Sequence, residues 1–378
     1  MASENPIIRK AGRLTAMALT AMLFAAMLAG AWAGHIDPAA WALPSMLCLV
    51  FPMLWLLCLG ISLLWLFFQS RKVYAAVCGV CLLLALPTLS EVSPLRFPDE
   101  PQPGTKVLRL LTYNVAGFQD IERPESSRNS YSRSLTYILD SDADIVCLQE
   151  LFSLEYALYD KRVSAEQTDS LKSRYPYCIS TENGEEVLLS KYPATLVTHL
   201  RDKDLNYFNY QLYHLTVDGH TLHVLNVHLP SYELTKSQKT IASSLRHNPG
   251  EVLNRQEGIS LYAKLRTAFE TRAMAARKLR DIVEGISGPL IVCGDFNDVP
   301  GSYAWQTIRD AGLEDAYCRT ALGPMVTFNA GHMFFHIDQV MYRPDCGLRP
   351  YSVSRGDLKS SDHYPVTALF ALDPDRMK

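Results

Sequence analysis

Three long stretches without a charged side chain lie near the start of this chain, and they constrain its fold more than any other feature. They cover residues 14–34, 38–70 and 73–90. A helix needs about 20 mostly apolar residues to cross the hydrocarbon layer of a membrane, so each stretch is long enough to do so. We therefore predict about three transmembrane helices, at residues 14–34, 44–68 and 73–90.

The charges beside these stretches predict an orientation. Arg9, Lys10 and Arg13 precede the first stretch, and Arg71 and Lys72 separate the second from the third. Because short loops rich in Lys and Arg stay in the cytoplasm, the third helix should lead outwards. We expect a multi-pass protein of a bacterial inner membrane whose remaining residues lie in the periplasm. A cleavable signal peptide is an alternative for the first stretch, and it gives the same placement.

The remainder of the chain has the composition of one large globular domain. We divide the chain into a transmembrane region at residues 1–91, a proline-rich linker at 92–105 and a catalytic domain at 106–378. A net charge of −3 excludes a strongly basic nucleic-acid coat, and nine cysteines are too few for a disulfide scaffold. One disulfide among the soluble cysteines Cys178, Cys318 and Cys346 is compatible with an oxidising compartment, and the sequence does not select the pair.

Short apolar segments alternate with helical patterns in the second region. Segments at 107–113, 145–148 and 290–293 are typical of strands. Between residues 259 and 283 the apolar positions recur at helical spacing instead. This alternation predicts an α/β fold.

Polar side chains stand at the ends of these predicted strands. They are the carboxylates, amides and imidazoles of Asn114, Glu150, His228, Asp295, Asn297, Asp338, Asp362 and His363. Such groups at one sheet edge are typical of a cleft. Oxygen-rich ligands suit a hard divalent cation, so we expect Mg²⁺ or Mn²⁺ as the cofactor.

The same residues belong to motifs that resemble the endonuclease/exonuclease/phosphatase superfamily, which includes DNase I-like nucleases. The motifs, in the superfamily's order, are Thr112-Tyr-Asn-Val115, Leu148-Gln-Glu150, Asn226-Val-His-Leu229, Gly294-Asp-Phe-Asn297, Ile337-Asp338 and Ser361-Asp-His363. The resemblance implies a four-layer α/β/β/α sandwich of the DNase I-like type, preceded here by the transmembrane helices.

The resemblance also implies a role for each polar residue. It assigns the metal ion to Asn114, Glu150 and Asp362. It assigns Asp295 to positioning or deprotonating the attacking water, and Asn297 to orienting that water or the phosphate.

The other three residues are catalytic groups that act on the phosphate. By the same resemblance, His363 contacts the scissile phosphate and Asp338 holds the imidazole in one tautomer. His228 donates a hydrogen bond or a proton to a phosphoryl oxygen.

These inferences predict a metal-dependent phosphoester hydrolase, most simply a phosphodiesterase, that is held in the lipid bilayer by its N-terminal helices. The substrate would be a nucleic acid or a phospholipid headgroup. A phosphomonoesterase of the inositol-phosphate type and a non-catalytic membrane sensor are the alternatives. The sequence indicates no protein partner.

Two further segments carry expectations. The basic cluster Arg272, Arg277, Lys278 and Arg280 is expected to form the solvated face of a helix. Residues 229–258 have the composition of an insertion near His228, which would either cap the site or form a loop.

Overall fold

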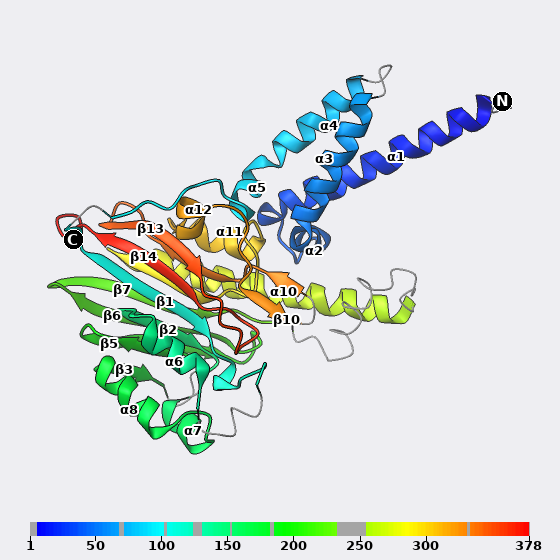
Figure 1. Ribbon diagram of the computed structural model, residues 1–378. Coiled ribbons are helices and arrows are strands. Elements are labelled where there is room, and N and C mark those ends of the chain that lie inside the picture. Colours follow the sequence, from blue (N-terminus) through cyan, green and yellow to red (C-terminus); the bar gives the residue numbers. More distant parts are fainter. Residues whose placement is uncertain are drawn as a thin grey trace.

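Two six-stranded sheets pack face to face, with helices on both outer faces (Figure 1). The computed structural model describes residues 6–67, 72–101, 104–123, 131–151, 153–181, 185–232, 255–330 and 333–377. Most of the segment 229–258 therefore lies outside the described residues. The predicted α/β sandwich is confirmed by this arrangement.

The first sheet has the order β13-β14-β1-β2-β4-β3. Its strands are β1 (Val107–Asn114), β2 (Ile145–Gln149), β3 (Tyr177–Ser180), β4 (Val187–Ser190), β13 (Leu348–Arg355) and β14 (Val366–Leu372). The central strands β1 and β2 are parallel, with Asn114 opposite Gln149. Both strands therefore end at the same edge of the sheet.

The second sheet has the order β5-β6-β7-β8-β12-β9. Its strands are β5 (Ala194–Asp202), β6 (Phe208–Val217), β7 (His220–His228), β8 (Leu290–Asp295), β9 (Glu314–Asp315) and β12 (Asp338–Tyr342). The strands β7 and β8 are parallel, and His228 pairs with Asp295. The antiparallel strand β12 begins beside the end of β8, because Asp338 pairs with Asp295.

Three apolar layers hold the sandwich together. Between the sheets, Cys147 and Cys293 are fully buried among aliphatic and aromatic side chains, as the strand-like sequence around each predicts. The outer layer on the first sheet contains η3 (Ala116–Phe118), α6 (Arg133–Asp140), α7 (Leu154–Tyr159) and α8 (Ala165–Arg174). The outer layer on the second contains α10 (Arg255–Glu284) and α11 (Tyr303–Arg309), with α12 (Ala316–Thr320) near its edge. All nine cysteines are free.

The N-terminal helices project from one end of the sandwich (Figure 1). They are α1 (Pro6–Ala31), η1 (Ala33–His35), α2 (Leu43–Leu49), α3 (Phe51–Phe67), α4 (Lys72–Leu84) and α5 (Leu86–Val92). Within the described residues, one helical segment, Lys10–Ala31, is long and apolar enough by itself to cross a membrane. Up to three segments meet that criterion if each bent helix pair counts as one span.

The second and third apolar stretches are bent, whereas the sequence pattern predicts single helices. The bend is 79° between α2 and α3, and 48° between α4 and α5. Each bend lies just before a proline in the first turn of the next helix, Pro52 or Pro87. A proline ring clashes with the carbonyl four residues earlier in a continuous helix, which explains both breaks.

The helical region is fixed to the sandwich by several contacts. Asp37, between η1 and α2, forms an ion pair with Arg277 of α10 at 2.9 Å, and Glu91 of α5 pairs with Arg309 of α11 at 2.5 Å. In the predicted linker, the backbone N–H of Arg96 donates to the carbonyl of Ala321 at 3.0 Å. The predicted linker therefore lies against the sandwich over part of its length.

Candidate active site

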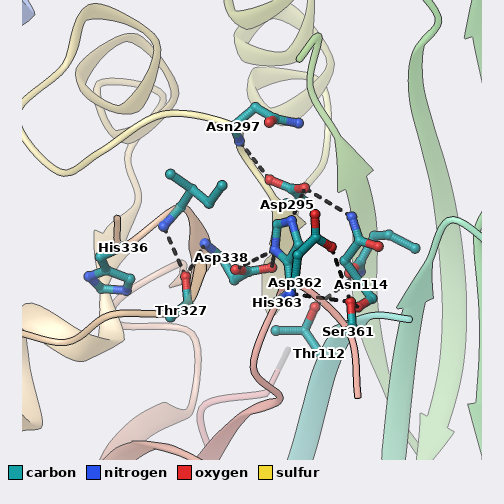
Figure 2. A network of polar contacts seen from close by, with 12 residues as sticks. Thr112, Asn114, Asp295, Asn297, Thr327, His336, Asp338, Ser361, Asp362 and His363 are labelled. Atoms are coloured by element: carbon teal, nitrogen blue, oxygen red, sulfur yellow. Dashed lines mark hydrogen bonds and ion pairs between the residues drawn. The ribbon is translucent and has the colours of Figure 1, made fainter. Parts of the chain in front are cut away.

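The polar strand ends of the two sheets meet at one edge of the sandwich (Figure 2). Asn114 is the last residue of β1, and its buried side chain joins the two sheets. Its amide donates to Glu150 Oε1 at 2.9 Å and to Asp295 Oδ2 at 3.1 Å. Its Oδ1 accepts from the backbone N–H of Ala116 at 3.2 Å, so the whole amide group is engaged.

Asp295 lies at the centre of these contacts and is 1% exposed. Its Oδ2 lies 3.4 Å from His363 Nε2 and 3.7 Å from His228 Nε2. Its Oδ1 accepts from the backbone N–H of Asn297 at 2.8 Å. One carboxylate therefore contacts groups from β1, from the end of β7 and from the loop before β14.

The backbone near this carboxylate is unusual at three positions. Glu150 and Asn297 have positive φ angles of 57° and 49°. Such a conformation costs about 1–3 kcal/mol for a residue other than glycine, and it concentrates at functional sites. Gly294 has φ 136°, and a Cβ there would lie 2.0 Å from the carbonyl oxygen of Val227. Glycine is therefore required for β8 to reach the position that places Asp295.

His363 is buried between two carboxylates. Its Nδ1 lies 2.9 Å from Asp338 Oδ2 and 3.0 Å from Asp338 Oδ1, while Nε2 faces Asp295. Burial alone would lower the pKa of His363, but the carboxylates of Asp338 and Asp295 outweigh it and raise the pKa to about 10. The imidazole is therefore a cation at neutral pH.

These groups form the polar floor of a pocket of about 420 Å³. The floor residues that line the pocket are Glu150, Asp295, Asn297, Asp362 and His363. The other lining residues are Leu49, Ser231, Tyr232, Leu261, Leu265, Phe328, Met333, Phe335 and Ile337. The pocket thus combines an ionic floor with mostly apolar walls.

Within the described part of the chain, two sets of side chains could bind a metal ion. They are Glu150, His228 and Asp295, and Asp295, Asp338 and His363, with the donor atoms of each set within 4.8 Å of one another. In the second set, Nδ1 of His363 is already bound to Asp338. The first set is more accessible to a divalent cation, because the side chain of Glu150 is 42% exposed and lines the pocket, whereas Asp338 and His363 of the second set are buried against each other.

Comparison with known protein families shows to which family the chain belongs. Residues 111–363 match the Endonuclease/Exonuclease/phosphatase family. The chain belongs to this family. Residues 13–92 match a second family, described only as a domain of unknown function. No curated protein matches the sequence.

Three solved structures align with most of this chain at low sequence identity. An endonuclease/exonuclease/phosphatase family protein of Bacteroides thetaiotaomicron is 16% identical, with TM-score 0.44 over 71% of this chain and 99% of that chain. A mannosyl-6-phosphatase of the same organism is 16% identical, with TM-score 0.44 over 70% and 100%. TDP2 of D. rerio, complexed with a single-strand DNA product, is 15% identical, with TM-score 0.43 over 70% and 99%.

The structure brings together all eight residues singled out in the sequence of this endonuclease/exonuclease/phosphatase domain. Of the three residues predicted to bind the metal ion, however, only Glu150 belongs to a set of side chains that could hold one. Glu150 belongs to the first metal-binding set and Asn114 donates to it, whereas Asp362 lines the pocket without belonging to either set. His228 and Asp295, predicted to be catalytic, join Glu150 in that set. The individual roles of the eight residues stay predictions.

Two supporting residues of the family site were not predicted. The hydroxyl of Thr327 accepts from the backbone N–H groups of Ile337 and Asp338, both at 3.0 Å, and so fixes the start of β12. Ser361 donates to the carbonyl of Asn114 at 2.8 Å and so ties the loop of His363 to β1. The Ser361-Asp-His363 motif contained a signal for Ser361, whereas no motif marked Thr327.

The expectation that Arg272 lies on a solvated helix face is wrong. Arg272 is 0% exposed, and its Nη1 lies 3.3 Å from Asp298 Oδ2, directly after Asn297. Its Nε donates to the carbonyl of Pro230 at 3.0 Å. The residue therefore braces the loops that follow β7 and β8. Charge spacing along one helix could not reveal this, because the partners come from two distant loops.

Proposed function

We propose that this chain is a membrane-anchored, metal-dependent phosphoester hydrolase, most simply a phosphodiesterase. The observation that carries the proposal is the position of Asp295, whose carboxylate meets Asn114, His228 and His363 on the floor of an open pocket. A buried carboxylate with two imidazoles and a second carboxylate nearby supplies a base, proton donors and cation ligands in one place.

Each of the floor residues has a different role in the proposed hydrolysis. Glu150 and Asp295 would hold the cation, with Asn114 keeping the two carboxylates in place through its amide hydrogen bonds. A bound Mg²⁺ or Mn²⁺ would neutralise charge on a phosphoryl oxygen. Asn297 orients the attacking water, and Asp362 adds a further carboxylate to the lining of the pocket.

The proton transfers follow from the same geometry. Water forms the new P–O bond and gives its proton to Asp295, while the P–O bond to the leaving group breaks. His363, held cationic by Asp338, offsets the negative charge that grows on the phosphoryl oxygens. His228, 13% exposed and 3.7 Å from Asp295 Oδ2, protonates the departing oxygen.

The anchoring proposal assigns residues 1–91 to the membrane, 92–105 to the linker and 106–378 to the catalytic domain. The apolar segment Lys10–Ala31 and the two bent helix pairs support it. The basic residues in the first turns of α1 favour a cytoplasmic N-terminus and a periplasmic catalytic domain. A reporter enzyme fused after Lys378 tests this orientation: activity of a periplasm-dependent reporter is expected, and activity of a cytoplasm-dependent reporter alone would contradict it.

The hydrolase proposal is tested with the full-length protein in detergent. Hydrolysis of bis-(p-nitrophenyl) phosphate and of p-nitrophenyl phosphate is followed with added Mg²⁺ or Mn²⁺. We expect the diester to be the better substrate. Asp295→Asn should lower kcat by about 10²–10⁴-fold, the usual contribution of a positioned base.

A matched control separates this effect from a general change in charge. Asp281 lies on α10 with its side chain 69% exposed, so Asp281→Asn should leave kcat unchanged. A folded wild-type protein that hydrolyses neither ester with either metal would favour the non-catalytic sensor. A preference for the monoester would favour the phosphatase alternative.

A further inference from the structure

The walls of the pocket are apolar, although its floor is ionic. Six wall residues come from three elements outside the central sheets: α2, α10 and the antiparallel pair β10 (Phe328–Ala330) and β11 (Met333–Phe335). They are Leu49, Leu261, Leu265, Phe328, Met333 and Phe335. A phosphate group alone gains nothing from such walls, so the substrate should carry an apolar part beside its phosphoester.

The elements that form the wall also carry exposed apolar side chains outside the pocket. Ile259 and Tyr262 of α10 are 61% and 45% exposed, and Phe334 of β11 is 46% exposed. Leu261 and Leu265 are only partly buried. A pocket wall with large exposed apolar side chains on the same elements is compatible with an apolar partner or a nearby membrane.

The position of Leu49 relates the pocket to the membrane. The apolar segment of α1 ends at Ala31. Trp32 and Trp41 follow, with 49% and 50% of their surface exposed. Exposed tryptophans at the end of an apolar helix are typical of the membrane–water boundary. The helix α2 begins two residues after Trp41, and its last residue, Leu49, is part of the pocket wall.

The sharp bend after α2 keeps this wall at the same boundary. The helix α3 leaves α2 at 79° and runs alongside α1, so α2 lies at the domain end of the helical region (Figure 1). Ala33 and Cys48 are buried against Val299 and Ile337 of the catalytic domain. The apolar wall is therefore held in a fixed position between the ionic floor and the membrane segment.

The charges of the pocket argue against a nucleic acid. None of the described residues that line it is a lysine or an arginine. Nucleic-acid binding depends mainly on basic side chains that neutralise successive phosphates. A lipid presents a single phosphoester next to a long apolar chain, which matches one ionic floor with apolar walls.

We infer that the substrate is a lipid phosphoester that lies in the same membrane as α1, with its headgroup on the floor and its first chain carbons against the apolar wall. This inference rests on the proposed hydrolase function and adds the substrate class. Leu261 and Leu265 are the specificity-determining residues, because they line the pocket from a helix that lies outside the predicted membrane spans.

The inference is tested with p-nitrophenyl phosphodiesters that differ only in their second alcohol. The full-length protein, in nanodiscs of phosphatidylcholine, is assayed with the methyl, butyl and hexyl esters. Burial of each methylene should raise kcat/KM by up to about fourfold. We expect kcat/KM for the hexyl ester to exceed kcat/KM for the methyl ester by at least about 30-fold. This is less than the limit for full burial of the five additional methylenes.

Two variants identify the wall as the cause. Leu261→Gln and Leu265→Gln should each lower the hexyl-to-methyl ratio of kcat/KM. Met274→Gln, on the same helix and 43% exposed but outside the pocket, should leave the ratio unchanged. The same hexyl-to-methyl ratio in the wild type and in both leucine variants would overturn the inference. The hydrolase proposal would stand in that case, because the methyl ester would still be hydrolysed.

The source of the substrate is tested with the hexadecyl ester in phosphatidylcholine vesicles. Rapid hydrolysis is expected when the ester and the protein occupy the same vesicles, and slow hydrolysis when they occupy separate vesicles. Equal rates would overturn the assignment to a lipid of the same membrane. A higher kcat/KM for thymidine 5′-(p-nitrophenyl phosphate) than for the hexyl ester would replace the lipid by a nucleic acid. No hydrolysis of any ester would instead contradict the hydrolase proposal itself.

Discussion

The floor and the walls of the pocket differ in how they are built. The floor residues Asn114, Asp295, Asp338 and His363 are at most 4% exposed, and each contacts another member of the site. The wall residues are only partly buried, and they come from α2, α10 and the β10–β11 pair. The floor lies at the ends of core strands, whereas the walls belong to elements outside the two six-stranded sheets.

This difference separates chemistry from substrate choice. A change on the floor disturbs buried ionic contacts and should affect every substrate equally. A change on the wall alters only the surface that an apolar chain would meet. The predictions below test whether the two parts behave independently, from the largest expected effect to the smallest.

Loss of the cationic imidazole should have the largest effect. His363→Gln removes the group that Asp338 and Asp295 keep charged, and we expect kcat to fall by about 10³-fold for short-chain and long-chain esters alike. Steady-state kinetics on the alkyl series measure this. The exposed His199 of β5 supplies the control variant, His199→Gln. A loss confined to the long-chain esters would show that floor and wall do not act separately.

Removal of Arg272 should destabilise the protein rather than change its specificity. Arg272→Met leaves Asp298 buried without its ionic partner, which typically costs about 3–5 kcal/mol. Thermal unfolding in detergent measures the loss. The exposed Arg266 pairs with Glu270 on the same helix, so Arg266→Met should cost less than about 1 kcal/mol. The double variant Arg272→Met/Asp298→Asn should recover part of the lost stability. Equal unfolding temperatures of Arg272→Met and Arg266→Met would refute the bracing role.

The metal requirement should depend on Glu150. Glu150→Gln weakens one carboxylate ligand, so the Mn²⁺ concentration for half-maximal activity should rise by at least about tenfold. A Mn²⁺ titration of diester hydrolysis measures it. Glu155→Gln, 72% exposed on α7, is the matched control. An unchanged metal requirement would exclude Glu150 as a ligand.

Acid should lower the stability of the folded protein through His336, which lies in the segment between a wall residue and a site residue. His336 lies between Phe335 and Asp338, and burial lowers its pKa to about 3. The folded state thus binds this proton less tightly than the unfolded state, whose pKa is about 6.5. This stability is present above pH 6.5 and is lost as the pH falls towards 3.

Between pH 7 and 5 the expected loss is about 2 kcal/mol. Chemical unfolding of the wild type and of His336→Gln at both pH values measures it. The variant should lose less stability on acidification. An identical loss in both proteins would assign the acid sensitivity to other groups.

The floor was predictable from the sequence because each of its residues lies at the end of an apolar strand or within a few residues of one. The alternation of strands and helices gave the α/β class, and motif order placed Asn114, Glu150 and Asp295 together. The bends at Val50 and Ala85 had a signal in Pro52 and Pro87, although the apolar pattern masked it.

The walls were not predictable, because they combine residues from segments far apart in the chain. Nothing local indicates that Leu49 meets Leu265 and Phe335 around one pocket. The burial of Arg272 was hidden for the same reason, since its partners Pro230 and Asp298 lie in two other loops. Residues 233–254, within the predicted insertion, lie outside the described residues.

Anomalous X-ray scattering from crystals of the full-length protein soaked in Mn²⁺ tests the central claim most directly. Our account predicts one strong manganese peak within about 2.5 Å of Glu150 and Asp295, at the floor of the pocket. Manganese bound elsewhere, with no peak within that distance of these two carboxylates, would contradict it.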